Sequence, residues 1–458
     1  MKKQIIIDND GGTDDFLTIQ YAVLSKQFDI KAITLVAGNT DIGNVRNNVF
    51  KALEMSGVTP EEAKKIGVYA PRYINLDTIS DGAQGSNGLG GVNYEISGDY
   101  VLNEGNAEDV LIQKVAENPE NISILAIGPL TNIANAIKQN PNFVQNVDEL
   151  VIMGGDEGGG NITPHAEFNI YQDPEAAKVV FEAGFKKITM IGFNVSKHFT
   201  LAPELEHLFI HGHIENPFVF DITGATADLD RNKNKVDGAS INDALTAMYL
   251  LHKDKYFRTK KAEVEVDVSD TDTRGKTDII NCKSENSCNV VTAVDKEALL
   301  KELFGTLYPD KTEHIALALK FGKSRDIIKD ELSKKFPNNS ENIHKWLDTY
   351  IKSACLVLAV AEDLVPYASD ESIDKLLREY LNIVIENPNL DLVELKSKLS
   401  NELKEKYPEE STNIEMLVNS QDENSEFYLK RMLKDCGIET DISKCRTKFR
   451  GRKSFERE

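Results

Sequence analysis

The sequence predicts an α/β protein with an open, mostly parallel sheet flanked by helices, followed by an all-α C-terminal appendage. Two observations carry this prediction. Short apolar runs alternate with amphipathic stretches over roughly the first 200 residues, and no strand candidate appears after about residue 300. Short buried strands separated by helices are typical of a parallel sheet, because parallel strands need crossover connections.

The elements of the N-terminal part alternate in order along the chain. The predicted strands are Gln4–Ile7, Ile30–Val36, Ile122–Ile127, Glu149–Met153 and Ile188–Phe193, all short and apolar. The predicted helices are Asp15–Leu24, Val45–Ser56, Asn106–Asn118, Leu130–Gln139 and Asp173–Ala183. Between Leu201 and Asn242 the pattern is helical, with a polar stretch over Asp228–Asp237 that we expect to be an exposed loop. Later strands, Ala262–Val268 and Asn289–Val294, flank an irregular insertion that contains cysteines.

Beyond Tyr308 the chain has the pattern of successive capped helices. The candidates are Glu341–Tyr350 after Ser340, an apolar stripe from Ile373 to Val384 after Asp370, and a stripe of Leu395, Leu399 and Leu403 after Asp391. We therefore place a domain boundary near 308–312. The sheet domain is expected over 1–308, and a helical region of unknown role over 312–458, which ends in a basic tail from Lys444 to Arg457.

Composition and charge exclude several classes of function. The net charge of −21 argues against a nucleic-acid partner, since phosphates are bound by clustered Lys and Arg. The longest apolar run, Ala354–Ala361, is too short to cross a bilayer, and no secretory signal follows Met1. The five cysteines are scattered and lack CxxC spacing, which favours reduced thiols in the cytoplasm; secretion without a signal stays open.

Polar clusters follow the predicted strands at the point where each strand ends. Asp8–Asp15 follows the first strand, Gly38-Asn39 the second, Gly128–Asn132 the third and Gly154–Asn169 the fourth. Open α/β sheets bind ligands at the carboxyl edge, where such loops converge. We therefore expect these clusters to form one shared site.

The first cluster contains four carboxylates, Asp8, Asp10, Asp14 and Asp15. Buried carboxylates raise one another's pKa, so such a cluster persists where a cation neutralises it. Hard oxygen ligands select calcium or magnesium, and a crowded, carboxylate-rich shell favours calcium. The alternative is a solvated turn in which Asp14 or Asp15 caps the following helix.

This cluster resembles a family signature. The run Asp8-Asn9-Asp10-Gly11-Gly12-Thr13-Asp14-Asp15 is similar to the DxDxGxDD motif of the inosine–uridine preferring nucleoside hydrolases. The resemblance covers roughly 1–307 and continues in Val36–Asn39, Gly128–Ala134, Met153–Gly155, Ala166–Ile170 and Asp173–Ala177. It implies calcium-dependent hydrolysis of the N-glycosidic bond of ribonucleosides to free base and ribose, in purine or pyrimidine salvage.

The resemblance also implies roles for single residues. Asp10, Asp15 and Asp243, with the backbone carbonyl of Ile127, would hold Ca²⁺, and Asp10 would deprotonate the attacking water. Asp8 would be a supporting acid. The ribose would be held by Asp14, Asn39, Asn161, Glu167 and Asn169, with Met153 beneath the ring. Anions near the ring also suit the positive charge of an oxocarbenium-like transition state.

Two positions depart from the family pattern on the base side of the site. Asn242 stands directly before Asp243 where many members have a histidine, and Gln84 replaces a second family histidine. Neither amide can protonate a departing base near neutral pH. His165 and His198 are alternative acids. The only tryptophan, Trp346, lies in the helical appendage.

Two other interpretations stay open. A DxD after a first strand also begins phosphatases of the haloacid dehalogenase type, although Gly11 follows Asp10 here and that class does not explain Ala166–Asn169. Alternatively, the protein is a catalytically weak or inactive ribose- or nucleoside-binding protein whose helical region is an interaction module. A homo-oligomer and a protein partner bound through 312–458 are further hypotheses.

Overall fold

The computed structural model divides into two compact units, Met1–Ala202 with Asn216–Asp310, and Pro203–Glu215 with Lys311–Glu458. The predicted boundary at 308–312 stays a prediction. The residues that the structure describes are 2–72, 84–210, 214, 218–234, 236, 238–281, 287–312, 315–316, 318–319, 334, 383, 392–408, 411, 414–415 and 418. Within these ranges no helix has both the length and the apolar character needed to span a bilayer.

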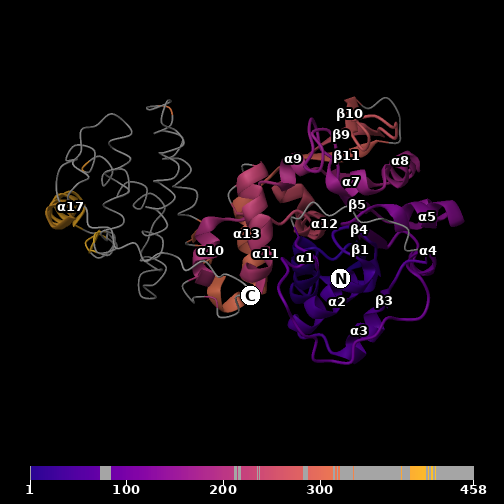
Figure 1. Cartoon of the computed structure of the whole chain (residues 1–458), viewed down its shortest axis with the longest axis horizontal. Helices are drawn as coiled ribbons and strands as arrows, with labels where there is room; N and C mark the ends of the chain where they lie inside the picture. The colour runs from indigo at the N-terminus through magenta and orange to yellow at the C-terminus, as the bar shows by residue number, and fades with distance from the viewer. Residues whose placement is uncertain are drawn as a thin grey trace. The chain divides into compact units, whose positions relative to one another are not determined.

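The first unit is built on a nine-stranded sheet with the order β10-β9-β11-β6-β5-β4-β1-β2-β3 (Figure 1). Neighbours from β11 through to β3 are parallel, whereas β9 is antiparallel to both β11 and β10. The bounds are β1 Lys3–Asn9, β2 Phe28–Leu35, β3 Val68–Tyr69, β4 Ile122–Ala126, β5 Leu150–Met153, β6 Ile188–Ile191, β9 Phe257–Val266, β10 Thr277–Asn281 and β11 Cys288–Val294. The predicted open, mostly parallel sheet is confirmed.

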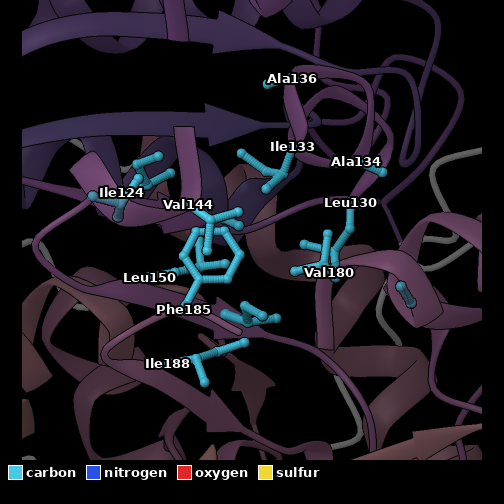
Figure 2. Packing of buried hydrophobic residues seen from close by; sticks show 14 of the residues in the cluster. Ile124, Leu130, Ile133, Ala134, Ala136, Val144, Leu150, Val180, Phe185 and Ile188 are labelled. Atoms are coloured by element: carbon cyan, nitrogen blue, oxygen red, sulfur yellow. The ribbon is translucent and has the colours of Figure 1, made fainter. Parts of the chain in front are cut away.

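Helices pack on the sheet in two sets. One set is α4 (Ala107–Glu117), α5 (Thr131–Gln139), α6 (Phe143–Asn146) and α8 (Pro174–Glu182), which contact one another. Figure 2 shows Ile124, Leu150 and Ile188 of the strands meeting apolar side chains of this set and Phe185. In the second set, α1 (Thr13–Leu24) packs against α2 (Ile42–Met55), α12 (Ala244–Tyr256) and α13 (Lys296–Leu307). With Ile5, Ile6 and Ile7 all fully buried, the central strand is covered on both faces.

The remaining elements of this unit connect or extend the sheet. They are α3 (Pro60–Ile66), α7 (Phe168–Gln172), α9 (Phe193–Ser196), α11 (Phe218–Leu229), the π-helical turn η1 (Asp230–Asn234) and the 3₁₀ turn η2 (Pro309–Lys311). β7 (Thr200–Leu201) and β8 (Ala239–Ser240) form a separate antiparallel pair.

Two predictions about the second half of the sheet unit are wrong. Residues 228–234 of the predicted loop are not an exposed loop, because α11 runs to Leu229 and continues as η1 to Asn234, with Asp230 buried. A run of polar residues suggested a solvated loop, but the Asp230 carboxylate is buried among hydrogen-bond donors. The insertion after Val268 contains β10, and β9 begins at Phe257 rather than Ala262. Exposed polar side chains at the start of β9 masked the strand pattern.

The second unit is described only in part. It contains α10 (Pro203–Ile210) and α17 (Leu392–Lys406), and the stripe of Leu395, Leu399 and Leu403 is buried, as predicted. Ile383, within the predicted stripe from Ile373 to Val384, is helical and buried. The rest of that stripe, the predicted helix Glu341–Tyr350 with Trp346, and the basic tail lie outside the described residues.

Candidate active site

The acidic loop leads from the end of β1 into the first turn of α1. Its carboxylates are buried: Asp8, Asp10 and Asp15 have no exposed surface, and Asp14 is 5% exposed. Asp15 accepts hydrogen bonds from the backbone N–H of Gly12 at 2.8 Å and of Asp10 at 3.1 Å, which folds the loop over the start of the helix. The helix N-cap is Gly12. The solvated-turn alternative is therefore wrong.

Asp243 joins this loop from the start of α12. Carboxylate oxygens of Asp14, Asp15 and Asp243 lie within 4.8 Å of one another. Burial raises the pKa of Asp10 and of Asp243 well above the usual range, and repulsion from neighbouring carboxylates raises it further. Burial also raises the pKa of Asp14 to about 7. In the part of the chain that the structure describes, no Lys or Arg forms an ion pair with these groups. This donor set fits a hard divalent cation.

Asp10 is enclosed by the loops that follow β2 and β4. Asn39 donates to its carboxylate from the backbone N–H at 2.9 Å and from Nδ2 at 2.8 Å. A Cβ on Gly38 would lie 2.0 Å from Asp10 Oδ2, and a Cβ on Gly128 would lie 2.9 Å from Asp10 Cβ. The carboxylate therefore has one accessible position, defined by backbone on two sides.

We expect Gly38→Ala to displace Asp10 and to lower both turnover and metal affinity at least about tenfold, because the added Cβ would lie only 2.0 Å from Asp10 Oδ2 and the buried carboxylate would have to move. Gly224→Ala is the matched control: a Cβ there meets nothing within 4 Å, and alanine is the better helix former. Metal titration followed by calorimetry, together with initial rates, measures both effects. Unchanged affinity and rate in Gly38→Ala would show that the position of Asp10 is unimportant.

Asp8, at the end of β1, anchors the start of the acidic loop by hydrogen bonds to neighbouring elements. Its Oδ1 accepts from Thr34 Oγ1 at 2.6 Å and from Asn132 Nδ2 at 2.8 Å, and its buried Oδ2 has no hydrogen-bond partner. Burial raises its pKa to about 7, against the lowering effect of these two donors. Asp8 thus joins β1 to β2 and to α5 without lining the pocket.

A pocket opens at the carboxyl edge of the sheet, where the loops after β1, β2, β4 and β5 converge. Its lining contains all the residues predicted to bind the metal, the ribose or the base except Asp10 and Asp15, which are fully buried. The predicted residues that line it are Asp14, Asn39, Gln84, Ile127, Met153, Asn161, Glu167, Asn169, Asn242 and Asp243. Their individual roles stay predictions.

The wall after β5 is held in place by its own hydrogen bonds. Glu167 caps α7 and accepts from the backbone N–H groups of Gly155 at 2.9 Å, Asn169 at 3.0 Å and Ile170 at 3.2 Å. Burial raises the pKa of Glu167 to about 7, although these donors lower it. Asn169 Nδ2 donates to the carbonyl oxygen of Met153 at 3.1 Å. A rigid polar wall of this kind costs little reorganisation when it binds hydroxyl groups.

The two amides predicted for the base side, Gln84 and Asn242, both approach Asp14. Asn242 Nδ2 lies 3.2 Å from Asp14 Oδ2, and Gln84 Nε2 lies 3.5 Å from Asp14 Oδ1. Gln84 Oε1 accepts from Thr13 N at 3.0 Å and Thr13 Oγ1 at 2.6 Å, which fixes the side-chain orientation. Neither His165 nor His198 lines the pocket. Among the residues placed by the structure, the lining therefore offers no histidine as an acid.

Sequence reasoning missed part of the pocket wall. The additional lining residues are Phe168, Phe193, Thr226, Leu229, Asp230, Asn234 and Ser240. Four of them, Thr226, Leu229, Asp230 and Asn234, lie on α11 and η1, within or beside the stretch misassigned as a loop. Helical spacing between Thr226 and Asp230 was the signal that could have placed them on one face.

Fold and site together define a class: an α/β protein with a carboxylate metal site and a polar pocket at the carboxyl edge of a parallel sheet. Residues 5–301 match the family model of inosine-uridine preferring nucleoside hydrolases. The chain belongs to this family, whose members hydrolyse N-glycosidic bonds, and the family assignment removes the phosphatase alternative.

Similar proteins support the assignment. The chain is 33% identical over 268 residues to a probable uridine nucleosidase of Oryza sativa subsp. japonica, covering 58% of this chain and 82% of the other. It is 30% identical over 284 residues to the pyrimidine-specific ribonucleoside hydrolase RihB of Escherichia coli, covering 60% and 87%. A plant nucleoside hydrolase structure matches with a TM-score of 0.61 and 29% identity, covering 67% and 99%. A purine-preferring ribonucleoside hydrolase from Gardnerella vaginalis matches with a TM-score of 0.59 and 25% identity, covering 67% and 98%.

Proposed function

We propose that this protein is a calcium-dependent ribonucleoside hydrolase that releases free base and ribose. The observation that carries the proposal is the buried group of Asp14, Asp15 and Asp243 at the floor of a polar pocket, in a chain of this family. The crowded carboxylate shell supports calcium, since magnesium requires a regular octahedral shell and keeps several waters. The names of the similar proteins include uridine, pyrimidine and purine specificities, so they do not select one base.

Each part of the site has a proposed task. Asp10, Asp15, Asp243 and the Ile127 carbonyl would hold Ca²⁺, and the carboxylate of Asp14 lies within 4.8 Å of those of Asp15 and Asp243. When bound, the ion supplies Lewis-acid polarisation of water. Asp10 accepts the proton of the attacking water, with its carboxylate oriented by Asn39. The wall around Met153, Asn161, Glu167 and Asn169 binds the ribose hydroxyls and faces the positive charge that develops on the sugar.

The test is a panel of ribonucleosides read by free ribose release, with and without a calcium chelator. We expect release that stops with the chelator and returns when calcium is added. Ribose and calcium binding without turnover over hours would instead favour the nucleoside-binding alternative.

Leaving-group activation is the weak step of this site, because Gln84 and Asn242 cannot release a proton. We expect nitrophenyl riboside, whose leaving group needs no acid, to be hydrolysed at least about 100-fold more efficiently than inosine or uridine, the lower end of a general-acid contribution. Asn242→His should raise kcat/KM on inosine and leave the nitrophenyl substrate little changed. Comparable efficiency on natural and activated substrates in the wild type contradicts this prediction.

We also propose a cytoplasmic location, supported by the scattered cysteines, of which Cys288 is buried and unpaired with another cysteine. Self-association and a protein partner for 312–458 are proposals as well. Analytical ultracentrifugation of the full chain and of a chain ending at residue 311 would measure whether the C-terminal region changes the assembly state.

A further inference from the structure

A further buried carboxylate, that of Asp230, lies in the part of the pocket wall built by α11, η1 and β8. It is 2% exposed. Its Oδ2 accepts from Ser240 N at 2.8 Å and from Ser240 Oγ at 2.7 Å, and its Oδ1 accepts from Asn234 Nδ2 at 2.7 Å. A backbone N–H and an amide NH₂ can only donate, so Asp230 accepts in both of those bonds. The proposed catalytic steps above do not use this group.

Asp230 determines how Ser240 meets a ligand. The Ser240 hydroxyl carries a single hydrogen, and that hydrogen is donated to the carboxylate. What Ser240 Oγ then offers to the pocket is a pair of acceptor sites. The hydroxyl, which elsewhere adapts to a donor or to an acceptor, is restricted here to accepting.

Asp14 restricts Asn242 in the same way. Asn242 Nδ2 donates to Asp14 Oδ2 at 3.2 Å, so the planar amide turns its Oδ1 away from that carboxylate. Asn242 Oδ1 is buried and has no hydrogen-bond partner. A buried acceptor without a donor is unfavourable, and a ligand N–H that reaches it removes the penalty. Ser240 and Asn242 both line the pocket, and they lie two positions apart on one segment.

We propose that Ser240 Oγ and Asn242 Oδ1 select nucleosides whose base carries an exocyclic amino group, cytidine and adenosine, over the oxo counterparts uridine and inosine. This inference rests on the proposed function, because it takes the pocket to hold a ribonucleoside. An amino group presents two N–H donors to acceptors, whereas a carbonyl oxygen in its place presents lone pairs to them. Uracil and hypoxanthine have one ring N–H next to a carbonyl group. That N–H can donate to one of the two acceptors, Ser240 Oγ or Asn242 Oδ1, but the other acceptor then faces the carbonyl oxygen.

The free bases test this selectivity without the differing reactivity of the nucleosides. On the full-length calcium-loaded protein, inhibition constants of cytosine, uracil, adenine and hypoxanthine are measured against nitrophenyl riboside hydrolysis. We expect cytosine to inhibit at least about tenfold more strongly than uracil, and adenine at least about tenfold more strongly than hypoxanthine. One additional satisfied hydrogen bond accounts for a difference of this size. Equal inhibition within each pair, or stronger inhibition by the oxo base, overturns the proposal.

Ser240→Ala identifies the acceptor. We expect this variant to lose most of the preference for cytosine while inhibition by uracil stays nearly constant, and Ser240→Thr to retain the preference. If the substitution only loosened the pocket wall, inhibition by cytosine and by uracil would weaken equally. That result would refute a selective role of Ser240. Ser269→Ala, on the exposed loop after β9, is the matched control. If the wild type hydrolyses nothing, the proposed function fails. Calorimetric titration of cytidine and uridine into the wild type then decides the selectivity by itself.

Discussion

Asp10→Asn should abolish turnover and leave the fold intact. The substitution is nearly isosteric, but an amide cannot take the proton of the attacking water, and it contributes no charge to the metal site. We expect kcat on any accepted ribonucleoside to fall about 10²–10⁴-fold, the range of a lost general base. Free ribose release is the measurement. A variant with more than a tenth of wild-type activity would overturn the assignment of Asp10.

The stability of the same variant separates a chemical role from a structural one. Repulsion from Asp15 contributes to the raised pKa of Asp10, so removing one charge relieves the cluster when no cation is present. In the presence of a chelator, the melting temperature of Asp10→Asn should therefore equal or exceed that of the wild type. Asp41→Asn is the control: Asp41 caps α2, where asparagine caps equally well, so activity and stability should both persist.

Calcium removal should destabilise the protein, and the loss of stability on calcium removal should be larger at higher pH. A ligand present at about 100 times its Kd stabilises by about 2.7 kcal/mol. Chelation should therefore lower the melting temperature by about 3–5 °C, because the entropy of unfolding of a domain of this size is about 0.6 kcal/mol/K. Differential scanning calorimetry measures the shift. Calcium should restore the melting temperature at lower concentration than magnesium does.

The pH dependence follows from the carboxylates of the calcium-free protein. Burial raises the pKa of Asp8 and of Asp14 from 3.8 to about 7, so the folded chain binds more protons than the unfolded chain between these values. Their contribution to stability is therefore fully present below about pH 4 and is lost as pH rises through about 7. Of these two carboxylates only that of Asp14 lies beside the proposed ion. Calcium replaces the proton of Asp14, so the stabilisation by calcium should be larger at about pH 8 than at about pH 5. Equal shifts at both pH values would show that Asp14 does not face the ion.

The sheet and the front of the site were predictable because their signals are local. The apolar run before Asp8 predicts a buried strand, and the four carboxylates that follow it within eight residues predict a cation site. Helical spacing could have placed Thr226 and Asp230 on one face, but the burial of Asp230 was not predictable, because it depends on donors from Ser240, ten positions away. A buried carboxylate that finds its donors in another element looks, in sequence, like a solvated one. The same limit applies to Asn242, whose role depends on Asp14.

The hydrogen bonds that complete the pocket join very distant parts of the chain. Asn242 meets Asp14 across 228 residues, Asn132 meets Asp8 across 124, and Gln84 meets Thr13 across 71. Such long loops close late in folding, because the entropy of ordering the intervening chain must be lost before the contact forms. Partly folded intermediates of this protein should therefore hold no complete ion site. During refolding, activity should return with the last kinetic phase in which native structure forms, and not with the first.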